Sequence, residues 1–185
     1  MTAAREPRPL WLQPANALTA LRLCVAPVCA WSVLADRPRT AAALFVFAVA
    51  SDLADGPLAR RRGEASVFGG LFDHTVDAIF VTTLLVALAV RDVVTALLPA
   101  LVVVAFVQYV LDSRALAGKR LRTTAIGRTN GIAYYVAAGI PLVRDALGLD
   151  WPNATLVAAF AWLLVTTTLA SIVDRALALL ATRRR

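Results

Sequence analysis

Long apolar runs, separated by short polar segments, dominate the chain. A helix needs about 20 residues to cross the hydrocarbon core of a bilayer. On that basis we place six membrane-spanning helices, at residues 17–35, 40–60, 67–90, 93–112, 129–147 and 154–180. The pattern predicts an all-α, polytopic membrane helical bundle with a short N-terminal segment lying along the membrane interface. We expect one domain over residues 1–185.

Composition and charge agree with a membrane protein. Of the 185 residues, 59% are hydrophobic, against about 45–50% in soluble domains. The net charge is +7, but the basic residues lie between the apolar runs, as in cytoplasmic membrane loops, so we expect no nucleic acid partner. With six spans, fifteen of the 19 Lys and Arg residues fall on the side of both termini. That side is therefore predicted to be cytoplasmic, and we expect an integral protein of the bacterial inner membrane.

Two of the predicted spans carry aspartates and small residues on one face. The set comprises Asp52, Asp55, Gly56, Ala59 and Arg60 in the second span, and Gly69, Asp73 and Asp77 in the third. At about 100° per residue, the members of each set fall on one side of their helix. The short loop at 61–66 makes the two helices antiparallel neighbours, so we expect the four carboxylates to lie at similar depth.

Four aspartates in a membrane need compensation. If each faced lipid at the bilayer centre, together they would cost up to roughly 10–14 kcal/mol. Arg60 is the only cation that the sequence places near them, and one cation cannot neutralise four charges. Carboxylate ligands suit hard cations, so we expect Mg2+ or Mn2+, with two ions per site. The alternative is that these are solvated or partly protonated helix-end aspartates, and that the small residues serve close helix packing.

These residues match the signature of a known family. D-x2-D-G-x2-A-R-x8-G-x3-D-x3-D marks the CDP-alcohol phosphotransferase family, and all eight fixed residues occur here at the required intervals. The signature covers 26 residues, from Asp52 to Asp77. The chain therefore resembles enzymes that transfer the phosphoryl-bearing part of a CDP-linked lipid or alcohol to an acceptor hydroxyl and release CMP. The resemblance implies a CDP-linked donor such as CDP-diacylglycerol and a small alcohol or alcohol phosphate as partners, among membrane lipids; a homodimer is left open.

The resemblance also implies roles for the matching residues. Asp52, Asp55 and Asp73 correspond to metal ligands, and Asp77 to a ligand and general base, so Asp73 and Asp77 are the expected catalytic pair. For CDP binding, Gly56, Ala59 and Gly69 correspond to a wall facing the cytidine and Arg60 to a diphosphate contact. His74, the only histidine, lies between two signature aspartates, and for it we favour an interior or packing role.

The acceptor is not specified by the signature. A basic cluster between residues 114 and 128 is on the same predicted side as the aspartates. Its simplest explanation is membrane topology, but Arg122 and Arg128 flank the start of the fifth span, where a phosphate-bearing acceptor such as glycerol 3-phosphate could bind. Two other classes remain open: an intramembrane Mg-dependent prenyltransferase and a divalent-cation transporter.

Overall fold

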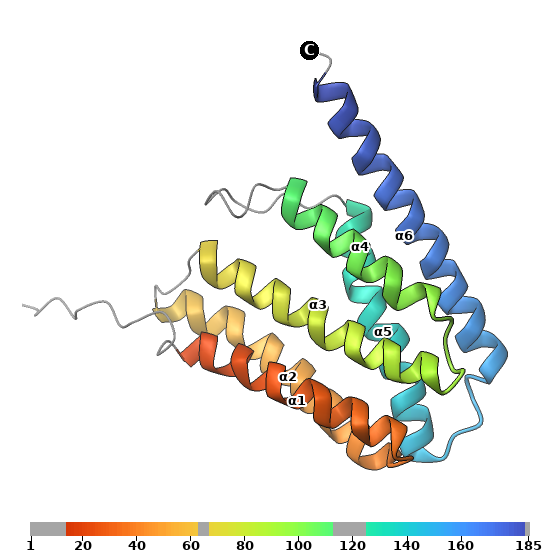
Figure 1. The fold of residues 1–185 in the computed structure, drawn as a ribbon. Helices are drawn as coiled ribbons and strands as arrows, with labels where there is room; N and C mark the ends of the chain where they lie inside the picture. Colours follow the sequence, from red (N-terminus) through yellow and green to blue (C-terminus); the bar gives the residue numbers. More distant parts are fainter. Residues whose placement is uncertain (1–13, 63–66, 113–124, 184–185) are drawn as a thin grey trace, which may run out of the picture.

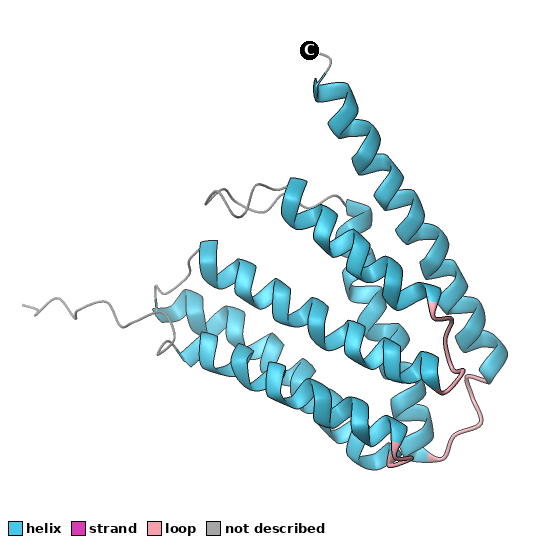
Figure 2. Ribbon diagram, in the orientation of Figure 1, coloured by secondary structure: helices cyan, strands magenta, loops and turns pink. Residues whose placement is uncertain are grey.

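Six helices form the chain in the computed structural model, which describes residues 14–62, 67–112 and 125–183 (Figure 1). Side chains are described for residues 17–53, 69–111 and 126–177. The helices are α1 (Pro14–Leu34), α2 (Pro38–Arg62), α3 (Val67–Val90), α4 (Leu97–Asp112), α5 (Ala125–Leu147) and α6 (Ala154–Arg183). Within the described ranges there is no strand, as Figure 2 shows. The all-α bundle predicted from the apolar runs is confirmed.

The helix bounds agree with the expected spans to within three residues except at the starts of α4 and α5, and α5 begins at Ala125, four residues before the expected start at 129. We expected the fourth span to begin at residue 93, and this is wrong, because residues 91–96 form a turn before α4. Thr95 Oγ1 accepts a hydrogen bond from the Leu97 backbone nitrogen at 3.3 Å, which is how a helix N-terminus is capped. Val94 is buried although it is not helical. An apolar residue in a turn therefore looked like part of the span.

Among the residues that the structure describes, three helices are long and apolar enough to cross a membrane. They comprise Ala17–Leu34, Gly69–Val90 and Ala154–Leu177, with mean hydropathies of 1.8, 1.6 and 2.1, and Leu97–Leu111 is a shorter apolar helix. The protein is therefore a helical membrane protein. That the remaining helices also cross stays a prediction, and the expected interfacial segment lies outside the described residues.

Successive helices run in opposite directions. Figure 1 shows the start of α1, the end of α2, the start of α3 and the end of α4 at one end of the bundle. Helix α1 packs on both α2 and α3, α2 packs on α5, and α6 packs on α4 and α5. The signature segments of α2 and α3 both lie towards that shared end. Helices α2 and α3 are antiparallel, as expected, but the expectation that they are packed neighbours is wrong, because α1 packs on both of them and α2 packs on α5 instead of α3.

The core contains a stack of aromatic rings that reaches from α2 to α5. The ring of Phe45 lies 6.3 Å from the rings of both Phe80 and Tyr135, and Phe80 and Tyr135 lie 6.1 Å apart. A Cβ atom at Gly139 would lie 2.6 Å from Phe45 Cε1, so only glycine lets α5 approach this ring without displacing it. The stack fixes Tyr135 where α5 faces α3.

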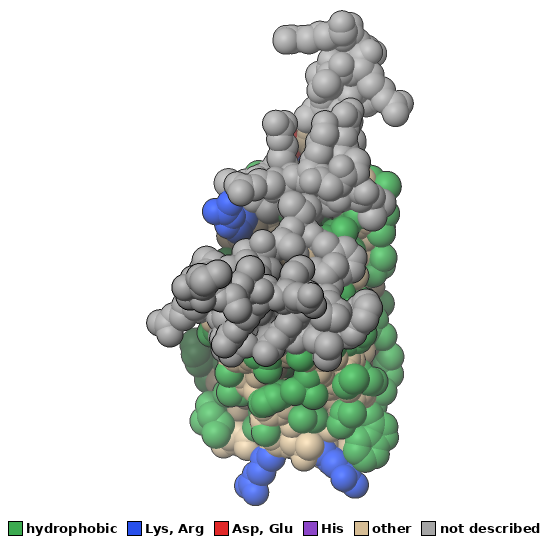
Figure 3. Space-filling model, turned by 90° about the vertical axis from the view of Figure 1, so that its left-hand side faces the viewer, with side chains coloured by type: hydrophobic (Ala, Val, Ile, Leu, Met, Phe, Trp, Pro, Cys, Tyr) green, Lys and Arg blue, Asp and Glu red, His purple; other side chains and the backbone are tan. Residues whose placement is uncertain are grey.

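The outer surface is largely apolar. Large hydrophobic side chains are exposed on every helix, among them Val28, Trp31, Val46, Val104 and Trp162. In Figure 3 hydrophobic side chains cover most of the surface that is not grey, and basic side chains lie at its lower edge. Such a surface suits contact with lipid, since a soluble monomer rarely exposes large apolar patches.

Candidate functional site

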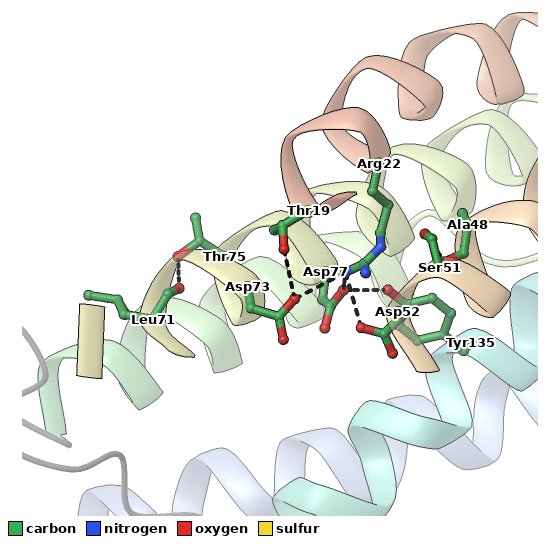
Figure 4. Close-up of polar contacts among 10 residues, drawn as sticks. All are labelled: Thr19, Arg22, Ala48, Ser51, Asp52, Leu71, Asp73, Thr75, Asp77 and Tyr135. Atoms are coloured by element: carbon green, nitrogen blue, oxygen red, sulfur yellow. Dashed lines mark hydrogen bonds and ion pairs between the residues drawn. The ribbon is translucent and has the colours of Figure 1, made fainter. Parts of the chain in front are cut away.

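Three of the signature aspartates converge on one arginine of α1. Arg22 Nη1 lies 3.1 Å from Asp52 Oδ1 of α2 and 3.3 Å from Asp73 Oδ1 of α3, and it donates a hydrogen bond to Asp77 Oδ1 (Figure 4). The Arg22 side chain is fully buried, with 0% exposure. A buried charge needs a partner of opposite sign. Here one cation is shared by three carboxylates from two helices.

Two hydroxyl groups complete this network. Tyr135 of α5 donates its hydroxyl hydrogen to Asp77 Oδ1 at 3.0 Å, and Thr19 of α1 donates to Asp73 Oδ1 at 3.4 Å. Thr19 is buried, and it lies one turn before Arg22 on the same face of α1. The site is therefore built by four helices, and Thr19, Arg22 and Tyr135 each contact a signature aspartate more than 50 positions away in sequence.

Local helix geometry explains why the carboxylates meet. Asp73 and Asp77 are four residues apart on α3, so they share one face, one turn apart. Asp52 comes from the antiparallel helix α2 at similar depth, as the sequence predicted. Each of the three carboxylates is only partly buried, with exposures of 33%, 32% and 21% for Asp52, Asp73 and Asp77. The cluster is therefore open on the side away from Arg22.

The predicted site residues differ in how far the structure describes them. The structure brings together Asp52, Asp73 and Asp77. The backbone positions of four others lie in α2, but their side chains are outside the described residues; these are Asp55, Gly56, Ala59 and Arg60. Gly69 lies in the first turn of α3 and is partly buried, and Arg128 lies near the start of α5 and is exposed. Arg122 lies outside the described residues.

Two expectations need correction. Arg60 is not the only cation available to the aspartates, because Arg22 contacts three of them. A charged residue inside an apolar span is itself a signal of function, and that signal could have found Arg22. The interior placement favoured for His74 is also wrong, since His74 is exposed. Its ring does have a packing contact, edge-on to Tyr109 with 6.2 Å between ring centroids.

The residues fit a divalent cation. One ligand atom each from Asp73, His74 and Asp77 can be chosen so that all three lie within 4.8 Å of one another, which is a group that could hold a metal ion. Figure 4 shows one oxygen of each carboxylate turned towards Arg22 and the other turned away. Three carboxylates and one arginine leave a surplus of negative charge among the described side chains. Oxygen donors with surplus negative charge suit a hard cation such as Mg2+ or Mn2+.

Comparison with known proteins identifies the family. A model of the CDP-alcohol phosphatidyltransferase family matches residues 12–180. A Schizosaccharomyces pombe protein named cardiolipin synthase (CMP-forming) / mitochondrial hydrolase fusion protein is 35% identical over 88 residues, which are 48% of this chain and 15% of that protein. A rice (Oryza sativa subsp. japonica) protein named CDP-diacylglycerol--glycerol-3-phosphate 3-phosphatidyltransferase 1, chloroplastic, is 23% identical over 194 residues, covering 94% of this chain and 58% of that protein.

The match extends well beyond the signature, from before α1 to near the end of α6. The chain spans less than two thirds of the length of either relative. The family model nevertheless covers most of this chain, including all the residues that meet at Arg22. This chain therefore belongs to the CDP-alcohol phosphatidyltransferase family.

Proposed function

We propose that this chain is an enzyme that transfers a phosphatidyl group from a CDP-linked donor, such as CDP-diacylglycerol, to an alcohol and releases CMP. The observation that carries the proposal is that Asp52, Asp73 and Asp77, which occupy aspartate positions of the family signature, each have a carboxylate oxygen within 3.3 Å of Arg22 Nη1. Membership of the family supports the reaction class. Phospholipid synthesis is the process in which such a reaction takes part.

The four signature aspartates are the proposed metal ligands: Asp52, Asp55, Asp73 and Asp77. We propose Mg2+ or Mn2+, with two ions per site. A bound divalent cation would polarise the phosphoryl oxygens and neutralise charge on the leaving CMP. The aspartates orient the donor through their fixed positions on α2 and α3. The exposed side of the cluster, away from Arg22, is where a diphosphate has access to them.

Asp77 is the proposed general base. A carboxylate that faces the acceptor hydroxyl can take its proton as the new phosphoester bond forms. The Tyr135 hydroxyl donates to Asp77 Oδ1 at 3.0 Å and so fixes the orientation of this carboxylate. The other oxygen of Asp77 is turned away from Arg22 in Figure 4, and it is the atom proposed to accept the proton. Asp73, one turn earlier, is the proposed partner in catalysis.

The nucleotide and the acceptor are proposed to use different residues. For CDP these are Gly56, Ala59, Arg60 and Gly69, where small residues leave room for the cytidine and the arginine pairs with the diphosphate. For the acceptor we propose Arg122 and Arg128 and a phosphate-bearing alcohol, glycerol 3-phosphate. Arg128 is exposed and lies in the first turn of α5, where backbone N–H groups also favour an anion. The name of the rice relative supports this acceptor.

The distribution of basic residues supports a proposal for the cellular location. We propose that residues 1–185 form a single domain in the bacterial cytoplasmic membrane with the site facing the cytoplasm. Cysteine labelling of intact cells tests the orientation. Cysteines introduced at Arg62 and Lys119 are expected to be protected from an impermeant reagent, and those at Arg39 and Arg144 to react. The opposite pattern would contradict the proposed orientation.

CMP release tests the function directly. Full-length protein in detergent, with Mg2+ and CDP-diacylglycerol, is incubated in turn with glycerol 3-phosphate, inositol phosphate, serine and phosphatidylglycerol, and the lipid product is identified. We expect CMP release in proportion to a new phospholipid, and its loss in Asp77→Asn. The matched control is Asp145→Asn, because Asp145 is an exposed aspartate paired with Arg144 outside the acidic cluster. No CMP release with any acceptor would refute the proposed function and favour a prenyltransferase or a cation transporter.

A further inference from the structure

Arg22 holds an unusual position for an arginine. Its side chain is 0% exposed, in a helix whose apolar segment Ala17–Leu34 is suited to cross a membrane. Its Nη1 atom contacts one oxygen of each of Asp52, Asp73 and Asp77. No residue of the family signature accounts for it, because that signature begins at Asp52.

The contacts of Arg22 stabilise both partners. A charged group in a low-dielectric environment is costly unless it is paired, and this applies to the buried guanidinium as much as to the three carboxylates. Without a cation between them, the carboxylates of α2 and α3 would repel one another at close range. Arg22 supplies this positive charge from within the protein.

The same contacts oppose a bound metal ion. A divalent cation held by these aspartates would be attracted by the same carboxylate charges that Arg22 partly offsets. It would also lie close to the guanidinium, and two like charges at short distance in a low-dielectric site repel strongly. Arg22 and a metal ion must therefore weaken each other's hold on the carboxylates, and this coupling is reciprocal.

We propose that Arg22 is an exchangeable counter-ion of the site: it partly neutralises the charge of Asp52, Asp73 and Asp77 when no metal is bound, and it gives up these carboxylates when a divalent cation binds. Arg22 thereby lowers the affinity for the metal while keeping the empty site folded. This inference rests on the proposed function in one respect, since it requires that the aspartates bind a divalent cation. The proposed role as counter-ion depends on the positive charge of Arg22 and on its position in α1.

Mn2+ binding to the full-length protein in detergent tests the proposal, with free Mn2+ measured by electron paramagnetic resonance. The variants are Arg22→Gln, which removes the charge, and Arg22→Lys, which keeps it. We expect the Kd of Arg22→Gln for Mn2+ to fall at least about tenfold, which corresponds to about 1.4 kcal/mol. Arg22→Lys is expected to stay closer to the wild type than to Arg22→Gln. If Arg22 only supported the fold, its loss would leave the aspartates less well positioned, and the Kd for Mn2+ would rise instead of falling.

The matched control is Arg91→Gln. Arg91 also pairs with an aspartate of another segment, Asp36 at 2.8 Å, but it directly follows the other end of α3, 14 residues from Asp77, which is about 21 Å at the rise of a helix. The Mn2+ affinity of Arg91→Gln is expected to equal that of the wild type. An equal change in both glutamine variants would mean that net charge alone sets the affinity, and it would overturn the proposal.

Thermal unfolding supplies a second readout. In EDTA, Arg22→Gln is expected to melt below the wild type, and saturating Mn2+ is expected to raise its Tm by more than it raises that of the wild type. Since the metal replaces the missing charge, the variant should fold when purified in Mn2+. Unfolded Arg22→Gln in Mn2+, or a folded variant with unchanged or weaker Mn2+ affinity, would overturn the proposal.

The wild type separates failure of this inference from failure of the proposed function. Wild-type protein that binds Mn2+ and releases CMP, alongside Arg22→Gln with unchanged affinity, would overturn the inference alone. Wild-type protein that binds Mn2+ with the predicted effect of Arg22→Gln, but releases no CMP with any acceptor, would overturn the proposed function alone. Wild-type protein that neither binds Mn2+ nor releases CMP would overturn both.

Discussion

Tyr135 offers a sharp test of the proposed role of Asp77. Its hydroxyl donates to Asp77 Oδ1 at 3.0 Å, while its ring stacks against Phe45 and Phe80. The substitution Tyr135→Phe keeps the ring and removes only the hydroxyl. The stack is therefore expected to survive, and the Asp77 carboxylate is expected to lose the contact that fixes its orientation on the α5 side.

The size of the effect follows from the strength of this hydrogen bond. A hydrogen bond to a charged group is worth about 1.5–3 kcal/mol, and 1.36 kcal/mol in activation free energy is tenfold in rate. We expect kcat to fall about 10- to 100-fold. The KM for CDP-diacylglycerol should change little, because Asp52 and Asp73 make no hydrogen bond to Tyr135 among those described. Tyr135 is a positioning residue in this reasoning, since it acts through Asp77.

Tyr134→Phe is the matched control. Tyr134 is the adjacent residue of α5, and its hydroxyl shares a buried hydrogen bond of 2.7 Å with Thr168 Oγ1 of α6. Its loss leaves Thr168 without that partner, so a lower Tm is expected with kcat unchanged. The assay is CMP release at saturating substrates, with Tm measured on the same samples.

Two results would refute the reasoning about Tyr135. One is a wild-type kcat in Tyr135→Phe. The other is an equal loss of kcat in both tyrosine variants, which would indicate a general effect on α5. A double variant adds a further check: if the hydroxyl acts through Asp77, Tyr135→Phe should cost almost nothing more in an Asp77→Asn background.

Three further predictions address the metal ligands, the core and the acceptor. Asp52→Asn is expected to lower the rate of CMP release more than about 100-fold and to abolish the rise in Tm on addition of Mn2+. Mutating a residue that only hydrogen-bonds to a metal ligand typically lowers metal affinity or activity about 10- to 100-fold, so loss of a ligand itself should cost more. Wild-type activity in this variant would contradict the role of Asp52 as a ligand. Gly139→Ala places a methyl group 2.6 Å from Phe45 Cε1, so the free energy of unfolding should fall by about 1–3 kcal/mol, while Gly131→Ala, where the added Cβ would meet nothing within 4 Å, should have no steric cost. Arg128→Ala is expected to raise the KM for glycerol 3-phosphate about 10- to 100-fold and to leave the KM for CDP-diacylglycerol unchanged. An unchanged KM for glycerol 3-phosphate would mean that Arg128 does not bind the acceptor and that the basic cluster serves only to orient the protein in the membrane.

The helices could be predicted from the sequence because their signal is one-dimensional. A span is a run of apolar residues of sufficient length, and neither the neighbours of the helix nor its orientation is needed to see it. The third span was placed at 67–90, and α3 covers Val67–Val90. The start of α4 was missed for the same reason: hydropathy does not distinguish a buried turn residue such as Val94 from a helical one.

The site was predicted only where the helix period and a short loop sufficed. Asp73 and Asp77 share a face because they are four residues apart, and Asp52 lies at a similar depth because a short connection joins the antiparallel helices α2 and α3. The three carboxylates meet at Arg22 because α1 packs on both helices. Arg22 and Tyr135 depend instead on how α1 and α5 are rotated within the bundle. A helix that is apolar on all sides carries no periodic signal for its rotation. Their contacts with Asp77, 55 and 58 residues away in sequence, therefore required the structure.

The charges of the site also bear on how the bundle holds together. In lipid, apolar side chains gain little by leaving the solvent, so helix association relies on close packing and on polar contacts between helices. Arg22 joins α1 to both α2 and α3 through Asp52, Asp73 and Asp77, and the Tyr135 hydroxyl joins α5 to α3. The groups proposed for catalysis are thus among the polar contacts that connect four helices. A lost charge should therefore lower the Tm as well as the rate. Substitutions here separate chemistry from assembly only when both are measured on the same sample, with Mn2+ present and absent.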